Sequence, residues 1–419
     1  MKHFKYRQFL AGLPYFRIMN YKIITFGCQQ NIADSEQIGA LLEKQGHKPV
    51  GTEASADLVV VNACSVRKSA TDRAYAKIKQ NKKAGKKIIL CGCITEKDKN
   101  NLKGWVDEFW APEEYFCAKP PISSGFRAFI PIMTGCNNFC SYCVVPHTRG
   151  QEISRPAETI LNEIKQALKN GAKEIVLLGQ NVNSYKSKSQ NFSDLLKQIN
   201  GLPGDFWLTF VSNHPKDMTD EMIKTAAKCA KVSPLIHLPF QSGNNAVLKK
   251  MNRHYTAGQY KKLVKSLRAA FAQHRPDDLP LAITTDVIVG FPGETKKQFT
   301  DSAKLMREVE FDMGYLSCYS PRPGTAAAKM EDDISMTEKR KREQVLNNIL
   351  RKTALKKNKK YIGKIVEVLI EETKSGFVRG KTKTGKNVKA GGRAKAGQII
   401  NVRIEKINPW GLAGRISNF

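Results

Sequence analysis

The hydrophobic residues of this chain form short apolar runs that alternate with amphipathic segments. In the first part, apolar runs at 22–26, 57–62 and 87–90 have the composition of buried strands, and 35–44 and 69–82 repeat their apolar residues with helical spacing. Such alternation predicts a small parallel sheet, whose ligands bind at the carboxyl ends of its strands. We therefore expect an N-terminal α/β domain over residues 20–120.

The same alternation continues six times from about residue 126 to 335, in a domain that we expect over residues 126–350. The predicted strands are 128–133, 174–178, 206–211, 234–238, 281–289 and 313–319, and the intervening helices include 157–169, 219–231, 257–270 and 296–309. Six parallel βα units predict an incomplete (βα)6 barrel of the TIM type. In such a barrel the loops that follow the strands build the active site.

The last part of the chain changes character. A highly charged helix is predicted over 337–361, followed by short β-type runs at 365–370, 377–379 and 398–404 with glycine-containing turns between them. This pattern predicts a compact β-barrel over residues 358–419. Its loops carry basic residues suited to a phosphate backbone, namely Lys381, Lys383, Lys386, Lys389, Arg393 and Lys395.

A cysteine run, C-x3-C-x2-C at Cys136, Cys140 and Cys143, follows the first strand of the predicted (βα)6 barrel. Three thiolates on this glycine-led loop can share one metal centre and leave one coordination position open. A closed structural zinc site has four ligands, and neither a fourth cysteine nor a suitably spaced histidine follows within reach, since His147 is only four residues past Cys143. A zinc loop or three ordinary thiols are the alternatives to an iron–sulfur cluster.

Three further cysteines, Cys28, Cys64 and Cys93, each follow one of the N-terminal strands. The carboxyl ends of parallel strands meet at one edge of a sheet, so we expect a second cysteine trio there. The alternative is that these are small buried residues at strand ends. Cys91 could replace Cys93, because strand alternation sends both to the same face, but we prefer Cys93 because it follows the turn-forming Gly92.

The composition of the chain indicates a class of binding partner and a cellular compartment. The 419 residues include 69 Lys and Arg against 38 Asp and Glu, a formal charge of +31, which favours a polyanionic partner such as nucleic acid over a solvated lysine surface or an acidic membrane. No apolar run approaches the ~20 residues of a membrane span. The basic segment 1–20 is interrupted by Pro14 and Arg17, so we expect no secretory signal. Ten cysteines then indicate a reducing compartment, the cytoplasm.

The spacing of Cys136, Cys140 and Cys143, with the aromatic Tyr142 before the last cysteine, resembles the radical S-adenosylmethionine (radical SAM) signature. The order of all parts resembles the methylthiotransferase family of radical SAM enzymes, and the terminal barrel resembles the RNA-binding TRAM domain. The gap from Cys93 to Cys136 looks short for the family. The segments most similar to the branch acting on N6-dimethylallyladenosine in tRNA are 143–150, 178–185, 212–215, 237–243, 289–295 and 319–324.

The resemblance implies two 4Fe–4S clusters, one on each trio, and SAM as cofactor. It implies methylthiolation of carbon 2 of N6-isopentenyladenosine beside the anticodon, through a 5′-deoxyadenosyl radical, with a reducing electron donor and a monomeric enzyme. The residues expected to contact SAM are Tyr142, Gln180, Asn181, Gln241, Gly290, Glu294 and Arg322. We expect His214 and His237 to be structural.

The sequence also allows other substrates and another class of function. Close relatives in the family act on threonylcarbamoyladenosine in tRNA or on a ribosomal protein. A different class of function is an RNA-binding protein whose metal centres are only structural.

Overall fold

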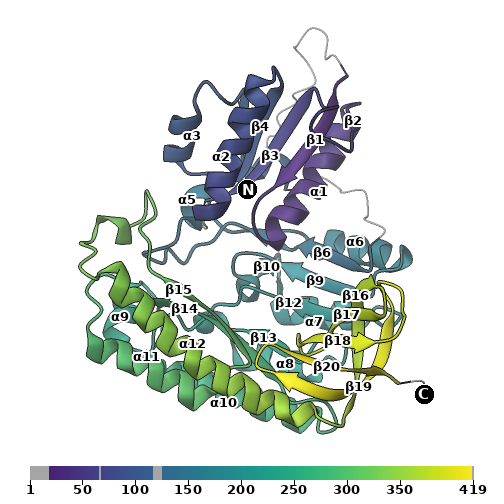
Figure 1. Ribbon diagram of the computed structural model, residues 1–419, viewed down its shortest axis with the longest axis vertical. Coiled ribbons are helices and arrows are strands. Elements are labelled where there is room, and N and C mark those ends of the chain that lie inside the picture. The colour runs from purple at the N-terminus through teal and green to yellow at the C-terminus, as the bar shows by residue number, and fades with distance from the viewer. Residues whose placement is uncertain (1–17, 66–67, 117–124, 418–419) are drawn as a thin grey trace. The chain divides into compact units, whose positions relative to one another are not determined.

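The computed structural model describes residues 18–65, 68–116 and 125–417 (Figure 1). Most of the basic segment 1–20 and Cys117 lie outside the described residues. By its contacts the chain divides into two units. The first unit combines residues 1–121 with 134–137 and 143–152, and the second contains the remaining residues, including most of the barrel and the C-terminus.

The first unit contains a five-stranded parallel sheet in the order β2-β1-β3-β4-β5. Its strands are β1 Asn20–Thr25, β2 Lys48–Pro49, β3 Leu58–Cys64, β4 Lys87–Cys93 and β5 Glu108–Phe109. Its helices are α1 Gln29–Lys44, α2 Lys68–Lys83, α3 Glu96–Leu102, α4 Pro112–Tyr115 and α5 Val145–Thr148. The predicted parallel sheet is confirmed, with two short edge strands despite the short gap before Cys136.

Both faces of this sheet are covered, which explains the continuous apolar runs of its central strands. Val59 and Val61 of β3 pack with Ile78 of α2 in one cluster, and Val60 packs with Ile38 of α1 in another. The predicted start of the first helix at residue 35 is wrong. Helix α1 begins at Gln29, and its start was missed because the side chains buried in its first two turns are mostly polar: Gln30, Asn31 and Asp34.

The second unit contains six parallel strands in two hydrogen-bonded groups, β6-β9-β12 and β13-β14-β15. An isolated parallel bridge from Leu208 to Val232 connects the groups. The strands are β6 Arg127–Pro131, β9 Glu174–Leu178, β12 Trp207–Phe210, β13 Leu235–His237, β14 Ala282–Val289 and β15 Met313–Cys318. The predicted incomplete (βα)6 barrel is confirmed.

Amphipathic helices surround these strands and bury one face each in a shared core. They are α6 Ala157–Lys169, α7 Phe192–Asn200, α8 Asp220–Lys228, α9 Asn245–Lys250, α10 Ala257–His274 and α11 Lys296–Val309. Short elements complete the loops: β7 Met133–Thr134, β8 Ile153–Ser154, η1 Val182–Ser184, β10 Lys186–Ser187, β11 Gln190–Asn191, η2 Pro215–Asp217 and η3 Ala327–Lys329.

The predicted charged helix is α12 Met336–Asn358, followed by η4 Lys359–Tyr361. This helix is not solvent-exposed on all sides, because Leu346, Leu350 and Ala354 form a buried apolar stripe along it. Two of its cations are also buried: Lys339 is paired with Asp332 at 2.5 Å and Arg342 with Glu294 at 2.8 Å. Helix α12 therefore belongs to the core of the second unit.

The chain ends in a closed five-stranded barrel in the order β16-β17-β18-β20-β19, as predicted (Figure 1). The strands are β16 Ile365–Lys374, β17 Phe377–Thr382, β18 Asn387–Gly391, β19 Ile399–Asn408 and β20 Gly411–Ile416. Inward-facing valines and isoleucines fill its interior. Strands β18 and β20 were not predicted individually, because their short sequences are rich in glycine and basic residues.

Two of the lysines predicted to bind phosphate make contacts inside the second unit, and the prediction is wrong for the buried one, Lys386. The Nζ atom of Lys386 lies 3.1 Å from the Asp312 carboxylate at the start of β15, and its side chain is 9% exposed. Lys383 donates to the carbonyl of Ala230 at 3.1 Å. Lys389, Arg393 and Lys395 are exposed.

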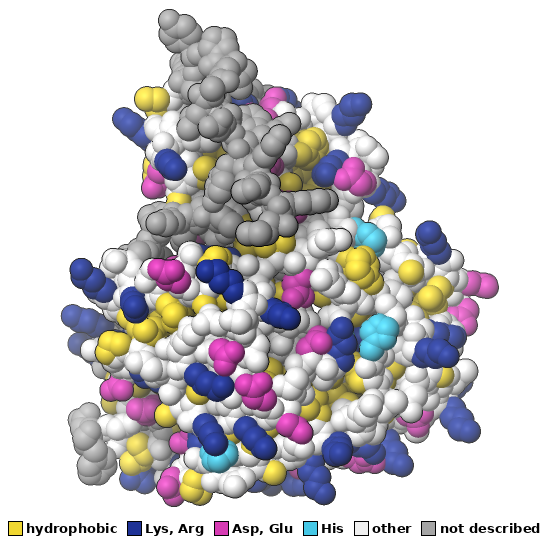
Figure 2. All heavy atoms as spheres, turned by 180° about the vertical axis from the view of Figure 1, so that it is seen from behind, with side chains coloured by type: hydrophobic (Ala, Val, Ile, Leu, Met, Phe, Trp, Pro, Cys, Tyr) yellow, Lys and Arg dark blue, Asp and Glu magenta, His cyan; other side chains and the backbone are white. Residues whose placement is uncertain are grey.

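Lys and Arg side chains are spread over the face shown in Figure 2, with acidic side chains between them. Within 18–65, 68–116 and 125–417, no helix combines the length and the apolar character that a bilayer crossing requires.

The Asp312 ion pairs provide a test of how the C-terminal barrel is anchored. Asp312 accepts from both Lys386 and Lys357 at 3.1 Å. Asp312→Ala leaves the buried Lys386 and the partly buried Lys357 without their carboxylate partner, and we expect it to lower the free energy of unfolding by about 3 kcal/mol, measured by urea denaturation. Lys356→Ala, which removes an exposed pair with Glu310, should cost less than about 1 kcal/mol. Equal costs for the two variants would contradict this account.

Candidate functional site

The carboxyl edge of the first sheet brings Cys28, Cys64 and Cys93 together. Cys64 and Cys93 end strands β3 and β4 and face each other in the parallel register. Their side chains lie within hydrogen-bonding distance, and Cys28, at the N-cap of α1, is close enough to Cys93 for their charges to interact. Cys91 lies in the core instead, where its Sγ contacts the carbonyl of Val61 at 3.6 Å.

Two buried asparagines hold the loops around this trio. The Asn31 amide donates to Asn62 Oδ1 at 2.8 Å, the Asn62 amide donates back to the Asn31 carbonyl at 2.8 Å, and Asn31 Oδ1 accepts from the backbone N–H of Cys28 at 3.2 Å. Gly92 has a φ of +94°, and a Cβ there would collide with Ala63 and Asn62. The trio is therefore held by a rigid polar frame.

Arg149 is the charged partner of the trio. It follows α5 in segment 143–152 of the first unit, and its side chain is 1% exposed. Its Nε donates to Cys93 Sγ at 3.0 Å and its Nη2 donates to Asp34 at 2.5 Å. The hydrogen bond from Cys64, together with the positive charge of Arg149, lowers the pKa of Cys93 to about 6 despite its burial. Cys93 is thus favoured as a thiolate, the form that binds metals.

The C-x3-C-x2-C loop spans the two units: Cys136 and Cys143 group with the first and Cys140 with the second. All three cysteines are partly exposed. Gly135 has a φ of +77° and its Cβ position is blocked by the Gln151 carbonyl, so only glycine fits before Cys136. Within the described ranges, no three or more His, Cys, Asp or Glu side chains are grouped so as to hold a single metal ion.

In the second unit, Arg253 contacts the middle cysteine of this loop. Arg253 is 7% exposed, and its Nη1 donates to Cys140 Sγ at 3.4 Å. Its Nη2 donates to the Pro239 carbonyl at 3.2 Å and its Nε donates to the Tyr255 hydroxyl at 3.2 Å. The sequence reasoning did not single out this arginine.

The loops after the strands of the second unit hold buried polar atoms that have no hydrogen-bond partner among the described residues. These atoms are Gln180 Oε1, Asn181 Oδ1, Asn213 Oδ1, His214 Nε2, Gln241 Oε1 and Glu294 Oε1. Unpaired buried acceptors are costly unless a ligand or water satisfies them. This donor and acceptor set fits the polar groups of SAM.

Three of the residues expected to contact SAM are also held by the protein. Asn181 donates to Asp217 at 2.7 Å, which fixes its amide. Gln241 has a φ of 62° and is bridged through its backbone to Val287. Tyr142 packs against the cluster that contains Phe291 and Tyr319.

Gly290 and Glu294 have structural tasks of their own. Glu294 Oε2 accepts from the backbone N–H of Gly290 at 2.7 Å and from Arg342 at 2.8 Å. A Cβ at Gly290 would collide with the Lys339 side chain of α12. The glycine thus permits the approach of α12, and contact with SAM remains a prediction for both residues. Arg322 is partly exposed, and its carbonyl accepts from Thr325.

The two histidines both have partners within the protein. His214 is buried, its Nδ1 accepts from the backbone N–H of Lys216 at 3.2 Å, and its ring contacts Tyr255 edge-on. Burial and the nearby positive charges of Arg253 and Lys216 lower the pKa of His214 to about 2. His237 Nδ1 bonds Thr284 at 2.9 Å.

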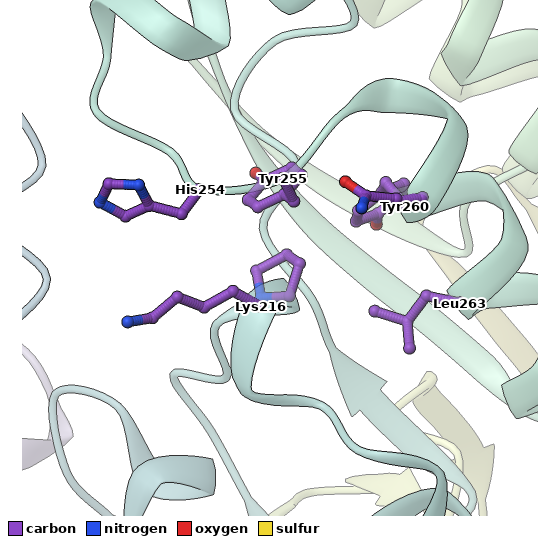
Figure 3. A pocket seen from close by; sticks show the side chains of 7 residues that line it. Lys216, His254, Tyr255, Tyr260 and Leu263 are labelled. Atoms are coloured by element: carbon purple, nitrogen blue, oxygen red, sulfur yellow. The ribbon is translucent and has the colours of Figure 1, made fainter.

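A pocket of about 230 Å³ opens beside the Arg253–Tyr255 turn (Figure 3). Lys216 and His254 extend in the same direction along it, and Tyr255 and Tyr260 lie further in (Figure 3). Two nitrogen-bearing side chains beside aromatic rings suit an anionic or nucleotide-like group.

Comparison with known proteins agrees with these features. Residues 130–306 match the Radical SAM superfamily, and residues 20–109 match the Uncharacterized protein family UPF0004. The tRNA-2-methylthio-N(6)-dimethylallyladenosine synthase of Endomicrobium trichonymphae is 38% identical over 95% of this chain and 100% of its own length. The enzyme of the same name from Clostridium botulinum (strain Hall) is 37% identical over 95% of this chain and 97% of its own.

The chain belongs to the radical SAM methylthiotransferase family. Among solved structures, this methylthiotransferase shares its fold with the radical SAM methyltransferase TsrM from Kitasatospora setae, with a TM-score of 0.57 and 12% identity over 74% of this chain and 77% of that one. The cobalamin-dependent enzyme OxsB, in its apo form, gives a TM-score of 0.53 and 12% identity over 81% of this chain and 56% of that one.

In this methylthiotransferase, sequence reasoning singled out the cysteines and the loops but not the residues that contact them. Asn31, Asn62, Arg149 and Arg253 were not singled out. The available signal was their polarity: Asn62 interrupts an apolar strand, and Arg149 precedes a glycine just after the cysteine run. Asp34 was missed because it lies just before the predicted helix 35–44, where an aspartate normally caps the helix at the protein surface.

The neutrality of His214 can be tested through the pH dependence of stability. Its pKa in the folded chain lies far below the unfolded value of about 6.5, so the unfolded state binds more protons as the pH falls, and stability is lost. We expect wild type to lose about 1 kcal/mol between pH 8 and pH 6 from this group. His214→Asn, which keeps an acceptor for the Lys216 N–H, should lack this loss.

The measurement is urea unfolding of both proteins at each pH. At pH 8, where histidine is neutral in both states, the comparison gives the cost of the substitution alone. Parallel pH profiles for the two proteins would contradict the assignment of a neutral buried His214.

Proposed function

We propose that this protein methylthiolates carbon 2 of N6-dimethylallyladenosine in tRNA. The observation that carries the proposal is the convergence of Cys28, Cys64 and Cys93 at one sheet edge, in a chain that also has the Cys136, Cys140 and Cys143 run. One cysteine trio would suffice for SAM cleavage. A second trio provides a separate place for a sulfur ligand.

Each trio has a distinct task in this proposal. Cys136, Cys140 and Cys143 hold the 4Fe–4S cluster that binds SAM, and Cys28, Cys64 and Cys93 hold the second cluster. Bound in this way, the two clusters and SAM supply a 5′-deoxyadenosyl radical, a methyl group and the sulfur. The chain itself supplies position, through the frame of Asn31 and Asn62 and the unpaired amide oxygens of the second unit.

The SAM site draws on the loops of the second unit. Gln180, Asn181 and Gln241 each carry an unpaired buried amide oxygen that can accept from the amino groups of SAM. Tyr142, packed against Phe291, presents an aromatic surface for the adenine. Gly290, Glu294 and Arg322 complete the proposed contacts.

The tRNA surface is proposed to include the exposed side of the terminal barrel. Lys389 Nζ lies 4.2 Å and the Arg379 guanidinium 5.3 Å from the ring centre of Phe377. A cation and an aromatic ring together suit a phosphate and a stacked base. The formal charge of +31 gives the long-range attraction that a polyanion requires.

The remaining expectations complete the proposal. The cysteine content and the tRNA substrate support a cytoplasmic enzyme that takes electrons from an external reductant. We propose that it acts as a monomer.

The function is tested by mass spectrometry of tRNA nucleosides from cells with and without this protein. We expect 2-methylthio-N6-dimethylallyladenosine only when the active protein is present. Cys140→Ala should abolish SAM cleavage, measured as 5′-deoxyadenosine formed with dithionite. Cys64→Ala should retain SAM cleavage and lose methylthiolation, because only the second trio is disrupted.

Three outcomes would contradict the proposal. SAM cleavage by Cys140→Ala would refute the role of the cysteine run. Loss of both activities in Cys64→Ala would give the N-terminal trio a folding role. A 2-methylthio group found only on threonylcarbamoyladenosine would assign the other tRNA substrate.

The tRNA surface is tested with the triple variant Lys389→Ala, Arg393→Ala, Lys395→Ala. We expect weaker tRNA binding at every salt concentration. The slope of log K against log[salt] should fall by about 0.7 to 0.9 for each lost phosphate contact.

A charge-matched control removes exposed lysines from the outer helices α6 and α11: Lys169→Ala, Lys297→Ala, Lys304→Ala. The measurement is fluorescence anisotropy with labelled tRNA. If the two triple variants change the affinity and the slope equally, the barrel is not the binding surface.

A further inference from the structure

Each cysteine trio is contacted by one fully or nearly buried arginine, and the contact at the N-terminal trio is the more constrained. Arg149 is 1% exposed and contacts both Cys93 and Asp34. Burying a guanidinium is costly unless its charge and its donors are compensated. If Arg149 only stabilised the fold, its ion pair with Asp34 would be sufficient. Its Nε also donates to the Cys93 sulfur.

We propose that Arg149 is a positioning residue of the N-terminal cluster, which holds Cys93 as a ligand and makes that cluster easier to reduce. This inference rests on the proposed function, since it assumes a 4Fe–4S cluster on Cys28, Cys64 and Cys93. Hydrogen bonds to the sulfur ligands of a cluster and nearby positive charge both stabilise its more negative, reduced state.

The surroundings of Arg149 fix its orientation. Asp34, which is fully buried in α1, accepts from Arg149 Nη2 through one oxygen and from the Gln30 amide at 3.0 Å through the other. The backbone N–H of Arg149 donates to the Val145 carbonyl at 2.8 Å, which closes the short helix α5. Both ends of the residue are therefore held, and Nε has little freedom to leave Cys93.

One donor of the buried guanidinium remains unused. Arg149 Nη1 has no hydrogen-bond partner among the described residues. The same holds for the hydroxyl of buried Tyr115, which lies close enough to Arg149 and Cys93 to interact with their charges. Both groups are buried hydrogen-bond donors without an acceptor in the described part of the chain. An inorganic sulfide of a cluster bound to the trio would be such an acceptor.

The second arginine shows the same arrangement in an independent place. Arg253 donates to Cys140 at 3.4 Å and is fixed by the Pro239 carbonyl and the Tyr255 hydroxyl. Arg149 and Arg253 come from unrelated segments, yet each places one N–H group on one cysteine of a trio. This repetition favours a task at the clusters over an accident of packing.

The test uses the full chain carrying Cys136→Ala, Cys140→Ala and Cys143→Ala, so that only the N-terminal cluster is present. The readouts are its midpoint potential, followed by electron paramagnetic resonance during a mediated titration, and the rate of iron loss to a chelator. Arg149→Met should give a more negative potential and about 10- to 100-fold faster iron loss.

Arg149→Lys keeps the charge opposite Asp34 but lacks the planar fork, so it should shift the potential in the same direction by less. This variant decides the matter if Arg149→Met does not fold. Arg155→Met is the matched control: Arg155 is 4% exposed and paired with Glu163 at 2.5 Å and the Pro131 carbonyl at 2.7 Å. It should leave the potential unchanged.

An unchanged potential in both Arg149 variants would overturn the proposal, even with faster iron loss, because Arg149 would then be only a structural anchor. Absence of any cluster on the intact N-terminal trio would also overturn it. Neither result depends on turnover. Failure of the proposed function is recognised separately, by the missing 5′-deoxyadenosine and the missing methylthio nucleoside of the protein with both trios intact.

Discussion

The parallel pairing of β3 with β4 is the constraint from which the N-terminal trio follows. With Leu58 opposite Lys87, the register runs without interruption to Cys64 opposite Cys93. A shift of one residue would turn either thiol to the other face of the sheet. Asn62 opposes such a shift, because its side chain would lose both hydrogen bonds to Asn31 and would turn toward the apolar face. The buried asparagine pair thus fixes the register that positions the thiols.

The energetic problem at this edge is to keep the Cys93 sulfur, the Asp34 carboxylate and the Arg149 guanidinium buried together. The sheet solves it with a compact charge network, in which Arg149 lies between the Asp34 carboxylate and the Cys93 sulfur. The start of α1 at Cys28 adds the positive end of a helix dipole to the same region. Removing any one member would leave a buried charge without compensation.

The sequence predicted the architecture well because the spacing of apolar residues along a strand or helix shows which side chains face the core. Strand β9 and helices α6 and α11 have the bounds expected from their apolar pattern. The same reasoning failed where polar side chains are buried: the first turns of α1 were missed, and Lys386 was assigned to solvent although it pairs with Asp312. Periodicity cannot distinguish a buried polar side chain with a partner from a solvated one, because the partner is distant in the sequence.

Chain connectivity also limits how far Cys143 can lie from the N-terminal trio. Arg149 lies six residues after Cys143, and both group with Cys93 in the first unit. Six extended residues span about 20 Å, and the helical turn of α5 shortens this reach. While Arg149 remains bound to Cys93, Cys143 can lie no farther from Cys93 than this distance plus the length of the Arg149 side chain. The segment 143–149 thus acts as a short tether within the first unit.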